Sequence, residues 1–405
     1  MTTALPTPSE LPVLPTTECP NCSVVVPDAA FCGACGASLR HEGSRASRRL
    51  HSYAAFPDEP VLRLSAVTSL FPQLSSHAKA PFRAALAVIA ALLVTLALVG
   101  AAAPLVALCA FGVPLLFLLY LWEVDPYEGS FLLPTAVCLV VGAALGVGWG
   151  IIGGHRVDQA LLPLFGTRLT GSRAIIAAVV VPGIGQLLMC VPLLLLRFVL
   201  RGDRESLDGF AAGASGALGF TLAATVTLMA PWFSTGQLVH QPFTLVLSQA
   251  VLRGISLPVI SALTTGLVGA AVWVSRRGVR TAAGGRWLSS PLPALVVALL
   301  IQIGLGFADV AFLSGLVLIV VHLAAVAIAI MLVRIGIHHV LLHESRLVVI
   351  GPPVPCSHCG HLVPAMPFCP ECGVAERALA RADRPTRHAH SLPTLNDAND
   401  HGGAS

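Results

Sequence analysis

The chain has 405 residues, of which 55% are hydrophobic and only 11% are charged. Water-soluble domains carry about 25% charged residues, so this composition excludes an ordinary soluble globule and predicts a membrane protein. A formal net charge of +4, spread over this length, gives no indication of nucleic-acid binding.

The chain begins with a polar segment that contains a cysteine cluster. Residues 1–17 are rich in Pro and Thr and lack the apolar core of a signal peptide, so we expect a disordered tail. Residues 18–39 hold two C-x-x-C pairs, the spacing typical of a zinc ribbon. The four cysteines are Cys19, Cys22, Cys32 and Cys35.

The next segment, residues 40–83, is predicted to be a linker. Its apolar residues Val61, Leu64, Val67 and Leu70 are spaced for one face of a helix, which would lie on the membrane surface. The alternative is a linker that orders only against the domain that follows it.

Residues 84–335 hold long apolar runs separated by short polar stretches and are predicted to form an all-α bundle of about eight transmembrane spans, because each span needs about 20 apolar residues. The expected spans are 84–102, 104–122, 131–153, 174–196, 210–232, 255–274, 289–308 and 310–332. Pro104 is expected to break the first two into a hairpin. Segment 243–252 is too short to span and is expected to be interfacial or re-entrant.

The distribution of Lys and Arg predicts which side of the bundle faces the cytosol. With the N-terminus inside, eleven of these residues lie near the membrane on the inner side and four lie outside, namely Arg156, Arg168, Arg173 and Arg253. Membrane proteins carry the excess on the cytosolic side. We therefore expect a multi-pass plasma-membrane protein with both termini in the cytosol.

A second cysteine cluster follows the bundle in residues 355–375, and residues 376–405 are expected to form a second disordered tail. Its cysteines are Cys356, Cys359, Cys369 and Cys372. The two clusters repeat each other at an offset of 337 residues, and the repeat includes Val26-Pro27 with Val363-Pro364 and Phe31 with Phe368. The chain is therefore predicted to carry one ribbon at each end of the bundle.

Four thiolates complete the tetrahedron of a Zn²⁺ ion, so the sequence predicts two structural zinc sites, each with four cysteine ligands, whose metal supplies the folding free energy. The alternative is disulfides or free thiols; a reducing cytosol disfavours disulfides, and the spacing repeated in both clusters favours zinc over free thiols. Neither ribbon has a basic or aromatic face suited to nucleic acid, so a protein partner is the expected ligand. Ribbons on the same side of the membrane are also able to dock on each other.

Few polar side chains are expected at membrane depth. Gln186, Gln302 and His322 fall within expected spans, and Asp309 lies at the turn between the last two. Because a polar group in the bilayer is costly, His322 marks a candidate intramembrane site. The alternative is a neutral histidine bonded to a neighbouring helix.

Small residues inside the spans are expected to serve packing. Cys109, Cys138 and Cys190 are predicted to be buried apolar residues. A series of glycines in the fifth span is expected to share one helix face and allow close packing. These glycines are Gly209, Gly213, Gly216 and Gly219.

Three stretches between about 115 and 335 carry a resemblance to a known family. They are YLWEVDPYE at 120–128, LDGFAAGASGALGF at 207–220, and Arg253 ahead of Thr264-Thr-Gly266. The block resembles the PrsW family of intramembrane metalloproteases, which implies the fold of that family. The combination with zinc ribbons is similar to chains from high-GC actinobacteria.

The resemblance also implies which positions would be catalytic, and all of them are replaced here. The paired glutamates of the family fall on Gly185 and Gln186, and its Glu-Asn pair falls on Ala224 and Thr225. Pro258 or Ile260 and Gln302 stand where histidines are expected. Without carboxylate or imidazole ligands, neither metal capture nor water activation is expected.

The leading hypothesis is a membrane scaffold or regulatory protein, a pseudoprotease whose two cytosolic ribbons recruit a protein partner. One alternative is an active intramembrane protease that uses unrecognised residues. These residues would be Glu123, Asp125, Glu128 and His322. A second alternative is a transporter.

Overall fold

The structure is a computed structural model that describes residues 15–41, 44–57, 59–65, 68–69, 79–123, 132–161, 172–199, 205–234, 242–274, 290–311, 314–344 and 350–379. Several predictions fall outside these residues. They concern the tail residues 1–14 and 380–405, Val67 and Leu70 of the linker, and residues 124–128 of the family-like stretch, including Asp125 and Glu128.

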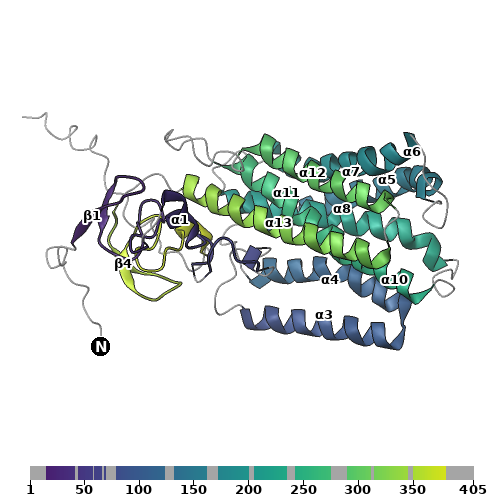
Figure 1. Ribbon diagram of the computed structural model, residues 1–405, viewed down its shortest axis with the longest axis horizontal. Coiled ribbons are helices and arrows are strands. Elements are labelled where there is room, and N and C mark those ends of the chain that lie inside the picture. Colours follow the sequence, from purple (N-terminus) through teal and green to yellow (C-terminus); the bar gives the residue numbers. More distant parts are fainter. Residues whose placement is uncertain are drawn as a thin grey trace, which may run out of the picture.

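Long apolar helices form the membrane bundle (Figure 1). In chain order they are α3 (Lys79–Val99), α4 (Ala102–Glu123), α5 (Leu132–Leu161), α6 (Ser172–Ile175) with the π-helical η3 (Ile176–Val180) and α7 (Val181–Val199), α8 (Ser206–Ser234), α10 (Phe243–Gln249) with the π-helical η4 (Ala250–Ser256) and α11 (Leu257–Trp273), α12 (Pro291–Val310) and α13 (Gly315–Glu344). Among the described residues, seven helices are long and apolar enough to cross a membrane, and α3 adds the shorter apolar segment Arg83–Val99. The predicted helical membrane bundle is confirmed.

The break between the first two helices lies at Gly100 rather than at Pro104. Gly100 has φ +74°, and the N–H groups of Gly100 and Ala101 donate to the carbonyls of Ala97 (3.3 Å) and Leu96 (3.0 Å). This is a Schellman cap, which needs a residue that tolerates positive φ. Pro104 lies in the first turn of α4, where a missing N–H has no intrahelical acceptor to lose. The prediction of a break at Pro104 was therefore wrong.

Segment 243–252 is not re-entrant. α10 continues through η4 into α11 as one helical path, and the apolar span begins at Val246. The sequence reading started this span after Arg253, because an arginine suggested the membrane surface. In the structure Arg253 lies inside the helix, where Nε donates to Oε1 of Gln249 at 2.9 Å.

α8 lies between α5 and α11, and its glycines serve both neighbours. A Cβ on Gly209 would lie 2.4 Å from the carbonyl oxygen of Gly269 on α11. A Cβ on Gly219 would lie 2.1 Å from that of Leu139 on α5. The prediction of a single face was wrong, because ten residues at about 100° each leave the two positions about 80° apart.

Two small antiparallel sheets form the ribbons, which lie together at one end of the bundle (Figure 1). β1 (Thr16–Glu18) pairs with β2 (Val25–Pro27), and β3 (Pro353–Pro355) pairs with β4 (Leu362–Pro364). A short helix α1 (Arg45–Leu50) follows the first ribbon, and a 3₁₀ turn (Glu376–Ala378) follows the second.

Residues 61–65 of the linker do not form the helical face expected there. Val61 is buried, Leu64 is 61% exposed, and residues 61–65 are not helical. Instead the loop formed by residues 53–57 and 59–61, hereafter the joint loop, is ordered against α13, as the alternative reading expected.

Candidate functional sites

Each cysteine cluster brings its four sulfur atoms into one group. All Sγ atoms of a cluster lie within 4.8 Å of one another, and none of the eleven cysteines forms a disulfide. Four of the sulfur–sulfur distances are 3.8 Å for Cys19–Cys35 and Cys22–Cys32, 4.0 Å for Cys356–Cys372 and 3.9 Å for Cys359–Cys369. A tetrahedral ion with metal–sulfur bonds of about 2.3 Å separates its sulfurs by about 3.8 Å. Both clusters therefore fit a tetrahedral metal ion.

Protons are shared unequally within each cluster. Hydrogen bonds from Cys22, Cys32 and Cys35 hold the pKa of Cys19 far below its ordinary value. The pKa of Cys32 is raised in turn, because its S–H group is a donor to Cys19. Four thiolates at such distances repel one another, and a divalent cation removes that repulsion while it displaces the protons.

The turn that follows each cysteine pair depends on positive φ. Gly36 and Gly373, which close the second pair of each ribbon, have φ +67° and +80°. Gly360 closes the first pair of the second ribbon with φ +75°, but its repeat counterpart is Ser23, with φ +59°. A non-glycine residue in this region carries backbone strain.

The two ribbons dock on each other about a pseudo-twofold axis. The N–H of Phe31 donates to the carbonyl of Pro370 at 2.8 Å, and the N–H of Phe368 donates to that of Gly33 at 3.0 Å. All four residues are related by the same offset of 337. Each phenylalanine ring also covers the closing glycine of the other ribbon, with Phe31 on Gly373 and Phe368 on Gly36.

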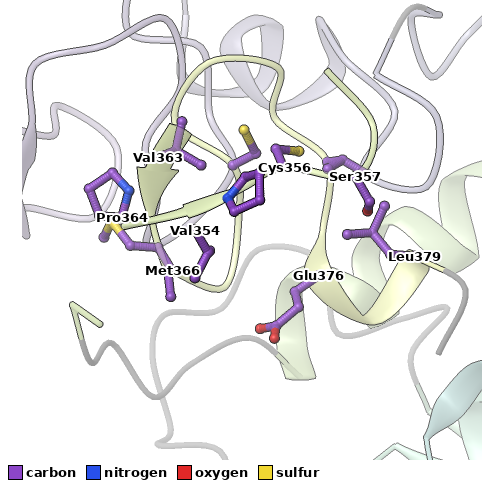
Figure 2. Close-up of a pocket in the computed structure, with 12 residues that line it drawn as sticks. Val354, Cys356, Ser357, Val363, Pro364, Met366, Glu376 and Leu379 are labelled. Carbon is purple, nitrogen blue, oxygen red and sulfur yellow. The ribbon is translucent and has the colours of Figure 1, made fainter. Parts of the chain in front are cut away.

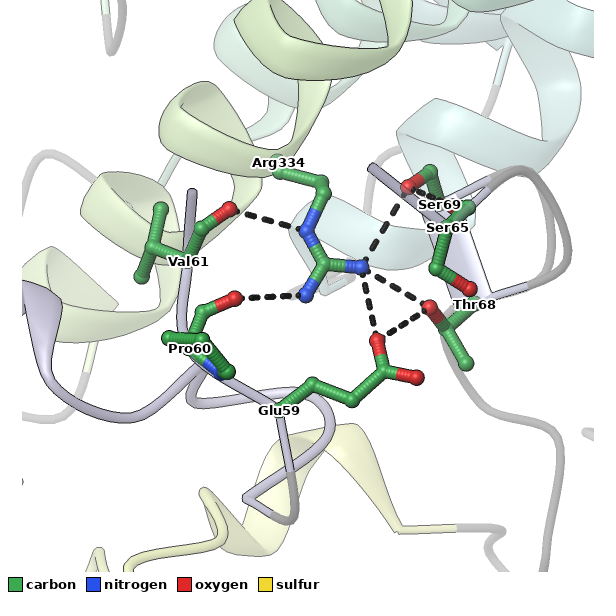
Figure 3. Close-up of polar contacts among 7 residues, drawn as sticks. All are labelled: Glu59, Pro60, Val61, Ser65, Thr68, Ser69 and Arg334. Carbon is green, nitrogen blue, oxygen red and sulfur yellow. Dashed lines mark hydrogen bonds and ion pairs between the residues drawn. The ribbon is translucent and has the colours of Figure 1, made fainter. Parts of the chain in front are cut away.

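A buried ion pair between Arg334 of α13 and Glu59 joins the ribbons to the bundle (Figure 3). Arg334 is fully buried, and its Nη1 donates to Oε2 of Glu59 at 3.0 Å and to Oγ1 of Thr68 at 2.8 Å. Its Nε and Nη2 donate to the carbonyls of Val61 (2.9 Å) and Pro60 (3.0 Å). The guanidinium is thus satisfied entirely by the linker.

His338, one turn after Arg334, holds the same loop. Its Nδ1 accepts a hydrogen bond from the backbone N–H of Ala54 at 3.2 Å. Because a backbone N–H can only donate, this ring nitrogen is unprotonated. The carbonyl of Ala54 accepts the N–H of Ala375 at 2.8 Å. The joint loop therefore connects α13 directly to the second ribbon.

The contact of the joint loop with Arg334 and His338 of α13 is hereafter the joint, and Tyr53 lies inside it. Its ring centroid is 4.3 Å from Cζ of Arg334, and its hydroxyl has no hydrogen-bond partner among the described residues. Burial raises the pKa of its phenol. Sequence reasoning missed the joint because it ended the last span at 332 and treated Arg334 as a loop residue. The available signal was an apolar run that continues past this arginine to Leu342.

A second polar group lies inside the bundle and connects α7, α11 and α12. Nε2 of Gln302 donates to Oγ of Ser261 at 3.0 Å and to Oε1 of Gln186 at 3.4 Å. Nε2 of Gln186 donates to Oγ1 of Thr265 at 3.1 Å. All four side chains are buried, so this network, hereafter the amide network, consists of amides and hydroxyls bonded to one another.

The other family-aligned positions lie on neighbouring helices. A Cβ on Gly185 would lie 4.0 Å from Nε1 of Trp149, and Ala224 belongs to the same apolar cluster as Trp149. Thr225 is partly buried on α8. The structure thus brings Gln186 and Gln302 into contact, while Gly185 and Ala224 share a neighbour.

A charged cluster occurs toward the other end of α13. Nε2 of His322 lies 3.2 Å from Oδ1 of Asp309, and Arg253 of η4 interacts electrostatically with this carboxylate. The side chain of His322 is 4% exposed and that of Asp309 is 49% exposed. Nδ1 of His322 is buried and has no hydrogen-bond partner within the described ranges.

The second ribbon carries an apolar hollow on its surface (Figure 2). Val354, Val363, Met366 and Leu379 line it together with Cys356 at the metal cluster, and Glu376 stands at its edge. Met366 also packs against Gly33 of the first ribbon, so the hollow lies next to the contact between the ribbons.

Comparison of the chain with protein-family models, curated proteins and solved structures finds no match. The functional proposal therefore rests on the geometry of the cysteine clusters, the joint, the amide network, the charged cluster and the apolar hollow.

Proposed function

We propose that this protein is a membrane scaffold or regulatory protein, a pseudoprotease of PrsW-like fold whose paired zinc ribbons recruit a protein partner on the cytosolic side. Zinc is the metal proposed for both tetrathiolate groups, since four cysteines at tetrahedral spacing favour it. The cytosolic assignment rests on the distribution of Lys and Arg and on the free thiols.

The amide network is the observation that carries the proposal. Gln186 and Gln302 occupy positions where the family resemblance expects metal-binding or proton-accepting groups, and each is bonded to a hydroxyl of α11. Amides and hydroxyls neither hold a catalytic metal strongly nor take a proton from water at neutral pH. The network stabilises helix packing without offering hydrolytic chemistry.

The arrangement of the ribbons supports a role in recruitment. Their mutual contact fixes them as one unit, and Arg334 and His338 attach that unit to a membrane helix. A partner bound to the ribbons would thereby be coupled to the bundle. The apolar hollow of the second ribbon is the surface proposed for an apolar side chain of that partner.

The recruitment proposal is tested by photo-cross-linking of the full chain in cells. A photoreactive residue at Leu379, inside the hollow, is expected to capture a protein whose cross-link disappears in Cys356→Ser. The same probe at Phe198, an exposed residue of α7, serves as the control. Capture that is indifferent to Cys356→Ser, or equal at both positions, overturns the recruitment proposal.

The alternative of an active protease is tested with membrane-helix substrates and the purified chain. In α4, Cys109 packs against Gly254, the neighbour of Arg253 in the charged cluster. Glu123 lies fourteen residues after Cys109 on the same helix, which is about 21 Å along its axis. Glu123 therefore ends near the ribbons, whereas His322 lies near the opposite end, which disfavours a joint catalytic role. Cleavage that is lost in Glu123→Ala or His322→Ala would overturn the pseudoprotease proposal.

One observation favours the transporter as a second candidate. Arg253, Asp309 and His322 are ionisable residues within three of the apolar spans, and such residues often mark substrate or ion pathways. Proton-coupled uptake by vesicles that is abolished in His322→Ala would establish this function instead.

A further inference from the structure

We infer that His322, Asp309 and Arg253 form a proton-binding site that opens at the end of the bundle away from the ribbons. The proposal goes beyond the recruitment function, because it assigns a ligand to a site that shares no residue with the ribbons or the joint. α13 begins at Gly315, so His322 lies about 10 Å along its axis. Arg334 of the joint lies about 18 Å further on.

The geometry identifies the atom that takes up the proton. An ionised carboxylate only accepts hydrogen bonds, so Nε2 of His322, at 3.2 Å from Asp309, carries the hydrogen. In the neutral ring the lone pair is then on Nδ1. This nitrogen is buried and unpartnered among the described residues, a costly arrangement for a polar atom that serves packing alone.

Asp309 links the buried imidazole to water. Its side chain is 49% exposed, near the end of α12, while its Oδ1 contacts the ring. A proton taken up by His322 converts this contact into an imidazolium–carboxylate pair. The carboxylate thus stabilises the protonated ring and keeps it near the aqueous face.

Arg253 opposes proton uptake. It remains cationic, and it lies on η4, which packs against α13. The elements around His322 contribute Asp309 from α12, Arg253 from η4 and the neutral Gln249 from α10, and Cys109 of α4 packs against Gly254 of η4. The site therefore alternates between net charges of zero and +1.

Other ligands suit the site less well. Among the described residues, only the two cysteine clusters bring three or more metal-binding side chains together. An anion would approach Arg253 but would meet the carboxylate of Asp309. A proton is the ligand that fits one base, one acid and one fixed cation.

The test is a pH titration of ¹⁵N-histidine-labelled full chain in nanodiscs by NMR, with His322→Gln to assign the signal. The titration covers pH 5 to about 8, the range in which histidines change charge, and the expected result is a change of the His322 ring-nitrogen signals from the neutral to the protonated form. Arg253→Gln is expected to increase the proton affinity about tenfold, and Asp309→Asn to decrease it by a similar factor. Arg197→Gln, at the exposed end of α7, is the matched control and is expected to leave it unchanged.

Two results overturn the inference. One is a wild-type His322 signal that does not change over this pH range, a result that depends on no variant. The other is a titration that moves in neither Arg253→Gln nor Asp309→Asn. Neither result bears on cross-linking at Leu379, so failure here is distinguishable from failure of the recruitment function.

Discussion

Removal of Glu59 is expected to release the joint loop from α13. In Glu59→Leu the buried guanidinium of Arg334 loses its counter-ion but keeps the hydroxyl of Thr68 and the carbonyls of Pro60 and Val61. Breaking a buried ion pair costs about 3–5 kcal/mol, and these remaining bonds favour the lower end. Since about 1.4 kcal/mol corresponds to a factor of ten, local opening of the loop is expected to increase at least about 100-fold.

Hydrogen exchange measured by mass spectrometry on the full chain in nanodiscs gives this opening directly. The N–H groups of Tyr53, Ala54 and Phe56 are bonded within the joint and are expected to exchange faster, while peptides from α8 stay protected. The double variant Glu59→Leu/Arg334→Met is expected to recover much of the protection, because it leaves no unpaired charge. Unchanged exchange in Glu59→Leu, or a double variant whose loss equals the sum of the two single losses, would refute the reasoning.

Three further predictions concern the ribbons, the bundle and pH. Ser23→Gly is expected to stabilise the first ribbon by about 1 kcal/mol and Gly360→Ser to destabilise the second similarly, measured as the chelator concentration that unfolds each ribbon. Gly142→Ala is expected to lower the melting temperature, because its Cβ would lie 2.1 Å from a backbone oxygen of α8. In the control Gly148→Ala on the same helix, the Cβ meets nothing within 4 Å, so the higher helix propensity of alanine is expected to raise the melting temperature. Burial raises the pKa of Tyr53, so the joint is expected to be fully stable below about pH 10 and to weaken above it. Hydrogen exchange of the joint loop measures this loss of stability, and in Tyr53→Phe the alkaline weakening is expected to be absent.

The ribbons were predictable from the sequence because their determinants are local and occur twice. Cysteine spacing specifies the metal cluster, and the repeated Phe31 and Phe368 supply both sides of the contact between the ribbons. Span positions were predictable for the same reason, since hydropathy is a property of contiguous residues. The errors occurred where one residue type is compatible with two structures: Pro104 was expected to break a helix but lies in the first turn of one, and Arg253 was expected outside the membrane but lies within a helix.

The joint and the amide network could not be found in this way, because their partners are far apart in the chain. Glu59 and Arg334 are separated by 275 residues, and neither lies in a motif. Family resemblance placed Gln186 and Gln302 at one site, but the hydroxyl partners were missed. Ser261, one residue beyond the position considered, is the side chain that meets Gln302.

The contact between the ribbons also bears on whether α3 crosses the membrane. Phe31 and Phe368 bond the two ribbons directly, so both must lie on the same side of the membrane. A chain with both ends on one side crosses an even number of times, yet only seven of the described helices are clear spans by length and hydropathy. The 21 residues of α3 extend about 31 Å, close to the thickness of the hydrocarbon core. We therefore expect α3 to be the eighth crossing, since without it the second ribbon would lie across the membrane from the first.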